Sequence, residues 1–333
     1  MERLVLTDSE RRDMCNLLDA LERRYPRADS DDFLNAAPVI THELPKRIRV
    51  ALNDFRLGLL SGTLTISGYP VDQDRIGPTP GHWRERQAEP PTLREELLLV
   101  LYASLVGDPF GWVTQQDGHL IHDVLPIRGH EHEQLGSSSE ELLTWHTEDA
   151  FHPLRSDFLL FGCLRNPYAA ATTIGSVDDL DLAESLRDVL FDVRFFILPD
   201  ESHRPHNNST DGGVDFSSVE QMRSRPDPIA VLFGDRDQPY LRADPYFMQV
   251  QDGDDEAQEA LDHLVKVMDE QMWDMDLESG DYFFIDNLRV VHGRKPFTAR
   301  HDGTDRWLKR INVTCDLRKS RAARASLTAR AIR

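Results

Sequence analysis

A histidine and a glutamate stand two positions apart in the apolar run LLTWHTEDAFHP, residues 142 to 153, as His146 and Glu148. In a β-strand, residues i and i+2 point to the same face about 6.5 Å apart, so both side chains can reach one metal ion while Trp145 and Thr147 face away. The pair alone is weak evidence, because 13 histidines and 58 acidic residues among 333 predict roughly two such pairs by chance. A third ligand elsewhere in the chain would make it informative.

The segment DYFFIDNLRVVHGRKPF offers that third ligand, because it predicts a strand, a turn, and then His292 followed by Gly293. A histidine at a strand end beside a glycine is well placed to enter a pocket. Two histidines and one carboxylate, with other coordination positions open, form the facial triad of non-haem Fe(II) oxygenases. The same ligand set also serves zinc hydrolases, so the metal stays open at this point.

Two arginines in DRWLKRINV favour the oxygenase. If this run is a strand, Arg306, Leu308, Arg310 and Asn312 share one face, opposite Trp307, Lys309 and Ile311. Arg306 and Arg310 then lie about 13 Å apart, too far to bind one carboxylate and suitably placed for two. Since the guanidinium fork binds carboxylates in a bidentate manner, this face suggests a dicarboxylic cosubstrate and a carboxylate-bearing substrate. Without the triad, surface salt bridges would be the favoured explanation of both arginines.

The overall composition sets limits on the partners. Hydrophobic residues make up 40% and charged residues 29% of the chain, as in a soluble globular protein, and 38 basic against 58 acidic residues give a net charge of -20. Such a charge disfavours nucleic acid and anionic membranes as partners. Three cysteines without a CxxC pair, and no apolar run of about 18 residues, indicate a cytoplasmic protein without disulfides. The oligomeric state stays open.

The pattern along the chain predicts helices before residue 110 and strands after it. Three helices are expected, the first capped by Thr7 and Glu10 and ended by Pro26, the second over 43–58, and the third opened by Thr92 and Glu95 and closed at Gly107. A strand is expected over 63–69 and a loop without regular structure over 70–91, where five prolines occur. The later runs are short and separated by Gly, Pro, Asn and Asp, as in an antiparallel sandwich or barrel, with one helix over 254–273 and a basic terminal helix or frayed end.

The runs WHTEDAFHPLRSDF, LRNP, LFGDRDQPYLRADPYF and VVHGRKPFTARHDGTDRWLKRINVTCDLRKSR resemble the clavaminate synthase-like branch of Fe(II)/2-oxoglutarate-dependent oxygenases, above all the free L-arginine hydroxylases of viomycin and streptothricin biosynthesis. The resemblance extends from about residue 55 to 321. It implies a mainly β fold with flanking helices, a distorted jelly roll or double-stranded β-helix. The whole chain, 1–333, would be one catalytic domain, with a mostly helical part over 1–110, a jelly-roll core over 111–320, and an inserted lid at about 198–225.

The resemblance also assigns site residues. His146, Glu148 and His292 match the iron ligands, while Arg306 and Thr172 match the residues that hold 2-oxoglutarate. For the substrate, Arg310 matches the partner of the α-carboxylate, and Gln115 and Glu148 match the partners of the α-amino group, with Gln116 as an alternative to Gln115. Asp244 matches an acid that meets the guanidinium group, and Asp200 and Ser202 match the lid. Tyr246 replaces a second acid of the viomycin enzyme, which leaves the side-chain specificity open.

The expected function is therefore hydroxylation of an unactivated carbon, with C3 favoured, of a free basic L-amino acid, most of all L-arginine, in an antibiotic pathway. The cofactor would be Fe(II), with 2-oxoglutarate and O2 as cosubstrates. Several alternatives stay open. The reaction could be hydroxylation at C4 or 4,5-desaturation of arginine, and the substrate could be lysine, citrulline, enduracididine or a carrier-bound amino acid. Glu148 argues against halogenation, because chloride would need its place on the metal. A zinc hydrolase and a noncatalytic jelly-roll binding module are alternatives from other classes.

Overall fold

Two β-sheets form the centre of the structure, a computed structural model that describes residues 2–208 and 213–333. The larger sheet contains, in spatial order, β1 (Glu2–Val5), β2 (Thr63–Ser67), β13 (Tyr282–Asp286), β6 (Phe158–Arg165), β15 (Trp307–Thr314), β3 (Asp108–Trp112) and β16 (Ala331–Ile332), with β4 (Ile121–Val124) also paired to β15. The smaller sheet contains β12 (Trp273–Met275), β7 (Thr172–Ser176), β14 (Val290–Arg294) and β5 (Leu143–His146). All pairs are antiparallel except β1 with β2 and β16 with β3.

The alternation of side chains along the central strands builds a layer on each face of the larger sheet. On β6, Phe158 and Leu160 belong to the hydrophobic cluster shared with the N-terminal helices. Leu159, Phe161 and Cys163 belong to a second cluster that includes residues of β7 and β14 in the smaller sheet. Because successive strand residues point to opposite faces, one strand supplies both layers. The space between the two sheets is therefore closed on one side by packed apolar side chains.

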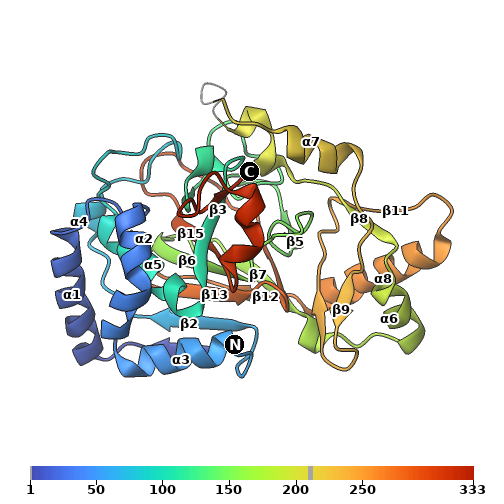
Figure 1. Ribbon diagram of the computed structural model, residues 1–333, viewed down its shortest axis with the longest axis horizontal. Coiled ribbons are helices and arrows are strands. Elements are labelled where there is room, and N and C mark those ends of the chain that lie inside the picture. The colour runs from blue at the N-terminus through green and yellow to red at the C-terminus, as the bar shows by residue number, and fades with distance from the viewer. Residues whose placement is uncertain (1, 209–212) are drawn as a thin grey trace.

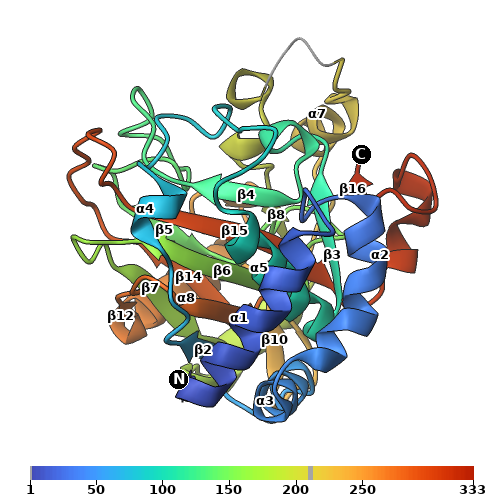
Figure 2. The ribbon, with the colours of Figure 1, turned by 90° about the vertical axis from the view of Figure 1, so that its left-hand side faces the viewer.

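Helices α1 (Asp8–Glu22), α2 (Asp31–Ile40), α3 (Lys46–Arg56) and α5 (Leu93–Val106) cover the outer face of the larger sheet (Figure 2). The predicted capping box of α1 is confirmed, because Glu10 N–H donates to Thr7 Oγ1 over 3.2 Å and Thr7 N–H donates to Glu10 Oε2 over 2.8 Å. The apolar run of α5 is buried between the other helices and the sheet, which explains why it is hydrophobic on every side.

A second group of elements packs beyond the smaller sheet, on the right in Figure 1. It comprises α6 (Glu184–Phe191), α8 (Asp255–Gln271) and the short strands β8 (Phe195–Ile197), β9 (Leu232–Gly234), β10 (Pro239–Leu241) and β11 (Met248–Val250), while α7 (Ser217–Ser224) lies at the top of the view. Trp145 of β5 packs into this cluster, and its Nε1 donates to Asp269 Oδ1 of α8 over 2.7 Å. Trp145 therefore points away from the space between the sheets, as the strand pattern predicted.

Several expectations were wrong in detail. The second expected helix, α3, begins at Lys46 and not at residue 43. Another helix, α2, precedes it; Ser30 caps its first turn and Pro38 lies within it. The proline-rich segment 70–91 holds a short helix, α4 (Gln73–Ile76), because Asp72 caps its first turn. The strand-rich part contains α6 and α7 besides the expected helix, which runs over Asp255–Gln271.

The end of the chain also differs from the expectation of a terminal helix or frayed end. Residues Leu317–Ala323 form the 3-10 helix η7, and β16 pairs with β3 in parallel. Among the residues that the structure describes, the other 3-10 helices are η1 (Thr41–Glu43), η2 (Gln116–Gly118), η3 (Val177–Asp179), η4 (Glu201–His203) and η5 (Pro205–Asn207). Within residues 2–208 and 213–333, no helix has both the length and the apolar character needed to cross a membrane.

Candidate active site

The pairing of β5 with β14 brings His146, Glu148 and His292 together. His146 and His292 are direct partners in the register of these two strands, and Glu148 follows His146 by two residues. Glu148 Oε2 lies 3.4 Å from His292 Nε2 and 3.8 Å from His146 Nε2. One ligand atom from each of the three side chains lies within 4.8 Å of the others, so the group could hold one metal ion. His292 lies inside β14, not at the strand end that the sequence suggested.

Local contacts orient the two imidazole rings. The carbonyl oxygen of Thr144 lies 2.8 Å from His146 Nδ1 and accepts a hydrogen bond from Nδ1–H, which leaves Nε2 facing Glu148. His292 packs against the Phe161 ring at 5.9 Å between centroids. Gly293 permits the close approach of β14 to β5, because a Cβ there would lie 2.5 Å from the carbonyl oxygen of Leu143. Glycine at this position therefore keeps the two histidines adjacent.

Glu148 is fixed as a buried anion. Its backbone N–H donates to Asn287 Oδ1 over 2.7 Å, and Asn287 Nδ2 donates to its carbonyl oxygen over 3.1 Å. Burial opposes ionisation, but the Arg310 guanidinium and the two imidazoles hold the pKa of Glu148 well below its usual range. Arg310 Nη1 binds Oε1, so Oε2 remains directed at His146 and His292. A buried carboxylate beside two imidazoles suits a divalent cation.

The two imidazoles differ in charge. Burial lowers the pKa of His292 to about 4, so this ring is neutral at neutral pH. Burial opposes protonation of His146 too, but Glu148 and Asp244 raise its pKa to about 9. The acidic groups thus favour a positive charge at this point, and a metal ion on Nε2 would take the place of the proton.

Behind the triad, two buried guanidinium groups have no acidic partner. Arg306 Nη2 donates to Thr172 Oγ1 over 3.3 Å, and no carboxylate of residues 2–208 or 213–333 forms an ion pair with Arg306 or Arg294. Burial lowers the pKa of Arg306 to about 10 and that of Arg294 to about 9, so both stay charged at neutral pH. Arg294 donates to the carbonyl oxygens of Ser139, Lys295 and Glu141 and to Ser138 Oγ. Arg306 lacks such a set of acceptors, and because an uncompensated buried charge is costly, it suits an anion.

On the other side of Glu148, Arg310 and Gln115 come together. Arg310 Nη2 donates to Gln115 Oε1 over 3.3 Å and lies 2.8 Å from His122 Nδ1. Gln116 points elsewhere, because its amide exchanges hydrogen bonds of 2.9 and 3.0 Å with the Asp123 backbone. Of the two glutamines left open by the sequence, the structure therefore brings Gln115 to Glu148 and Arg310.

Acidic side chains line the far end of this region. Asp244 is 7% exposed, and within the described ranges no Lys or Arg pairs with it. Burial raises its pKa to about 7, opposed by His146 and assisted by the nearby charge of Asp200. Asp200 caps η4 by accepting from Ser202 N–H over 2.8 Å, and Ser202 Oγ accepts from Gln115 Nε2 over 2.6 Å. Tyr246, at the position of the second acid, is 59% exposed and has no carboxylate to pair with a guanidinium group. Part of the expected lid, residues 209–212, lies outside the described residues.

Sequence reasoning missed two buried residues beside these groups, Asp149 and His203. They lie 3.1 Å apart between Oδ1 and Nε2, and together with Asp200 they form a second cluster of potential ligand atoms. The only signal for Asp149 was its place directly after Glu148, and no pattern around His203 indicated a role.

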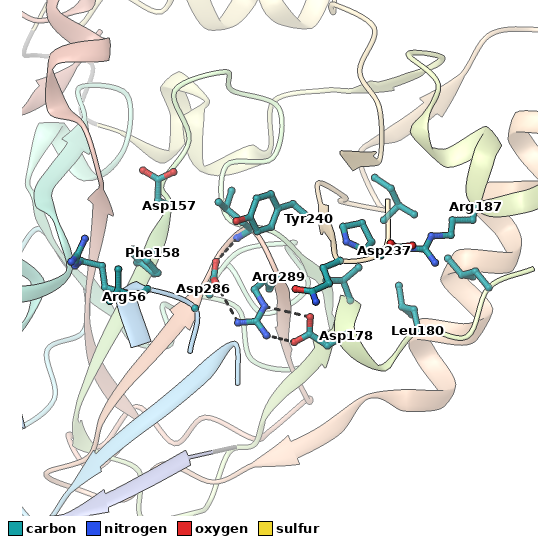
Figure 3. A pocket seen from close by; sticks show the side chains of 18 of the residues that line it. Arg56, Asp157, Phe158, Asp178, Leu180, Arg187, Asp237, Tyr240, Asp286 and Arg289 are labelled. Atoms are coloured by element: carbon teal, nitrogen blue, oxygen red, sulfur yellow. Dashed lines mark hydrogen bonds and ion pairs between the residues drawn. The ribbon is translucent and has the colours of Figure 1, made fainter. Parts of the chain in front are cut away.

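A cavity of about 710 Å3 is lined by residues other than the triad (Figure 3). An ion pair between Arg289 and Asp178 crosses it, and Asp286 lies beside them. Asp157, at its edge, accepts from Thr314 Oγ1 over 3.0 Å and from Cys315 N–H over 2.7 Å, which is a structural role. None of the predicted site residues lines this cavity.

Known proteins are similar to this chain in sequence and fold. Residues 103–312 match the family described as taurine catabolism dioxygenase TauD, TfdA family. The chain is 48% identical over 323 residues to enduracididine beta-hydroxylase of Streptomyces hygroscopicus, covering 94% of each chain. It is 44% identical to L-ornithine/L-arginine 3-hydroxylase of Catenulispora acidiphila, covering 97% of each. The crystal structure of the non-heme iron oxygenase OrfP with Fe, succinate and (3S)-hydroxy-L-Arg superposes with a TM-score of 0.96 at 46% identity, covering 100% of both chains. The predicted resemblance and the jelly-roll fold are confirmed.

Proposed function

This chain belongs to the TauD/TfdA dioxygenase family, and we propose that it is an Fe(II)- and 2-oxoglutarate-dependent enzyme that hydroxylates C3 of free L-arginine. The observation that carries the proposal is the charge arrangement. The possible metal ligands His146, Glu148 and His292 lie near Asp244, a buried acid with which no Lys or Arg of the described residues pairs. Arg306 is a buried cation that has no acidic partner among the described residues. A metal ion, an anionic cosubstrate and a cationic substrate would together neutralise these groups.

Two sets of residues would prepare the oxidant. His146, Glu148 and His292 would hold the iron, and Arg306 with Thr172 would seat the distal carboxylate of 2-oxoglutarate. Iron bound there would supply O2 activation coupled to decarboxylation of 2-oxoglutarate to succinate. Among the described residues, the buried cation Arg306 has a neutral hydroxyl, that of Thr172, as its one hydrogen-bond partner, so its charge remains available for the cosubstrate.

A third set would hold both ends of the substrate. Arg310 would pair with the α-carboxylate, Gln115 and the second oxygen of Glu148 would accept from the α-ammonium group, and Asp244 would pair with the guanidinium group. Asp200 and Ser202 would cover this pocket from the lid. Fixing both ends matters because a displacement of about 1 Å from the reactive position can cost a hundredfold in rate.

The relatives favour arginine and C3. OrfP was crystallised with succinate and a 3-hydroxyarginine, and two relatives are described as a beta-hydroxylase and a 3-hydroxylase. Enduracididine is the second candidate substrate, because the enduracididine hydroxylase shares 48% identity with this chain. Hydroxylation at C4, lysine or citrulline as substrate, 4,5-desaturation and a zinc hydrolase are outcomes that the following experiment separates.

The test is turnover of the purified protein with Fe(II), 2-oxoglutarate, O2 and a panel of arginine, enduracididine, ornithine, lysine and citrulline. We expect succinate in equal amount to a product about 16 mass units heavier than arginine, with the new hydroxyl at C3 by NMR. A product about 2 units lighter would instead mean desaturation. Absence of both succinate and product with every amino acid would reject the proposal. Hydrolysis of one of these amino acids with zinc in place of iron would instead support a zinc hydrolase.

We also propose that residues 1–333 form one catalytic domain that acts in the cytoplasm, in an antibiotic pathway. Strands from both ends of the chain, β1 and β16, support the single domain, because both belong to the large sheet. The three free cysteines fit a reducing compartment. A single cooperative unfolding transition seen by both fluorescence and circular dichroism is expected, and two separate transitions would contradict it.

A further inference from the structure

Asp149 connects the strand of the metal triad to three other parts of the fold. Its carboxylate is buried and accepts four hydrogen bonds, from Trp112 Nε1 at 2.6 Å, His203 Nε2 at 3.1 Å, Gln115 Nε2 at 3.2 Å and Asn312 Nδ2 at 3.3 Å. Its backbone has φ of 51°, a left-handed conformation that is uncommon outside glycine. Such a conformation persists where the surroundings determine it strongly, and these four donors do so.

The first consequence concerns the Gln115 amide. Carboxylate oxygens only accept hydrogen bonds, so the amide group that faces Asp149 must be the NH2. Ser202 Oγ accepts from the same NH2 over 2.6 Å, since the Ser202 hydroxyl is itself donated to Asp200. Gln115 Oε1 is thereby turned toward Arg310 Nη2, and Arg310 Nη1 in turn binds Glu148. An oxygen at this position can accept from an ammonium group, whereas the NH2 would oppose it.

The second consequence concerns the lid. His203, in η4, is 1% exposed, and besides the contact with Asp149 its Nδ1 lies 2.7 Å from Thr114 Oγ1. Asn208 Nδ2 donates to the carbonyl oxygens of Thr114 and Ser202 over 2.7 and 2.9 Å. The lid segment therefore docks on the same carboxylate oxygen, Asp149 Oδ1, that receives the Gln115 amide.

We propose that Asp149 is a positioning residue that orients the Gln115 amide toward a free α-ammonium group and, through His203, ties that orientation to the docking of residues 201–208. The inference rests on the proposed function, because it assigns the recognition of the substrate's amino group. It makes the free α-amino group a requirement for efficient turnover, so arginine analogues without it should be poor substrates.

The test compares arginine with 5-guanidinopentanoate, which lacks the α-amino group, in the wild type, Asp149→Asn and a control. An asparagine must turn its own NH2 toward one of the four donors, so the network rearranges and the Gln115 amide is free to turn. We expect kcat/KM for arginine to fall roughly 10- to 100-fold, mainly through KM, as for loss of one hydrogen bond to a charged group, with little change for 5-guanidinopentanoate. The visible charge-transfer absorption of anaerobic enzyme with Fe(II) and 2-oxoglutarate should keep its half-saturation.

The matched control is Asp281→Asn, another buried carboxylate, which accepts from Arg3 and from the Glu278 backbone and lies outside the site. Asp281→Asn should leave kcat/KM for both substrates unchanged. A second readout does not depend on turnover. Hydrogen exchange of residues 201–208 should be faster in Asp149→Asn and in His203→Ala than in the wild type, and unchanged in Asp281→Asn.

Unchanged discrimination between the two substrates together with unchanged exchange of residues 201–208 would overturn the inference. If Asp149→Asn does not fold, His203→Ala decides, because it should also raise lid exchange and KM for arginine. If the wild type oxidises no amino acid of the panel, the proposed function fails, while the exchange measurement still decides whether Asp149 holds the lid.

Discussion

Replacing Asp244 by asparagine should separate the recognition of a cationic substrate from the chemistry. Asp244 is buried, and no Lys or Arg of the described ranges pairs with it. Asparagine keeps the size and some hydrogen-bonding capacity but removes the charge. In the proposed complex, this change leaves the guanidinium group of arginine without its counter-ion.

The size of the effect follows from the burial of the pair. Breaking a buried ion pair costs about 3–5 kcal/mol, and each 1.36 kcal/mol corresponds to a tenfold change in rate, so kcat/KM for arginine should fall by roughly 150- to 5000-fold. The amide still accepts a hydrogen bond, so we expect the lower end of this range. Citrulline carries a neutral ureido group, and its kcat/KM should fall much less or rise.

The pH dependence gives an independent readout of the same charge. Burial raises the pKa of Asp244 to about 7, so in the free enzyme a proton competes with the guanidinium group below that pH. Wild-type kcat/KM for arginine should therefore fall about tenfold for each pH unit below 7, while Asp244→Asn should lack this limb. The exposed-turn variant Asp235→Asn serves as the control. Steady-state assays from pH 5.5 to 8.5 in which Asp244→Asn keeps wild-type kcat/KM and the same limb would refute the reasoning.

Three further perturbations test other parts of the site. Gly293→Ala places a Cβ 2.5 Å from the Leu143 carbonyl oxygen and should push β14 away from β5. In a chelator competition, we expect iron binding to weaken about tenfold or more. Unchanged iron affinity would contradict the role given to this glycine. Arg306→Gln should raise KM for 2-oxoglutarate roughly 100-fold at constant KM for arginine, and a rise in the arginine KM instead would misplace the cosubstrate. Lys309→Met removes the cation that lies 2.8 Å from Glu96 and 2.6 Å from Asp123. Urea titration should show a loss of about 3–5 kcal/mol in the free energy of unfolding, while kcat/KM is retained. Equal stability of the variant and the wild type would contradict this role of Lys309.

Local patterns were sufficient for the elements whose burial follows a simple period. The strand β2 and the capping box of α1 were predictable because the alternation of TLTIS and the Thr7 and Glu10 spacing are written in consecutive residues. Helix α2 was missed because Pro38 interrupts the helical pattern, although the helix tolerates it. The last strand, β16, was missed because two residues carry no period.

The candidate site was predictable where a motif placed its residues side by side, as with His146 and Glu148. The adjacency of His292 depends on the register of β14 with β5, which the resemblance implied and no local pattern contains. Asp149 shows the limit of such reasoning. Its partners Trp112, His203 and Asn312 are 37, 54 and 163 residues away, and only the folded chain brings them together.

Anaerobic titration of the purified protein with Fe(II) in saturating 2-oxoglutarate tests the central claim most directly. The account predicts a weak visible charge-transfer band that saturates at one iron per chain in the wild type and is absent in His292→Ala. The two proteins should have the same far-ultraviolet circular dichroism spectrum. A band of equal intensity in His292→Ala, or no band in the wild type, would contradict the assignment of His146, Glu148 and His292 as the ligands of a catalytic iron.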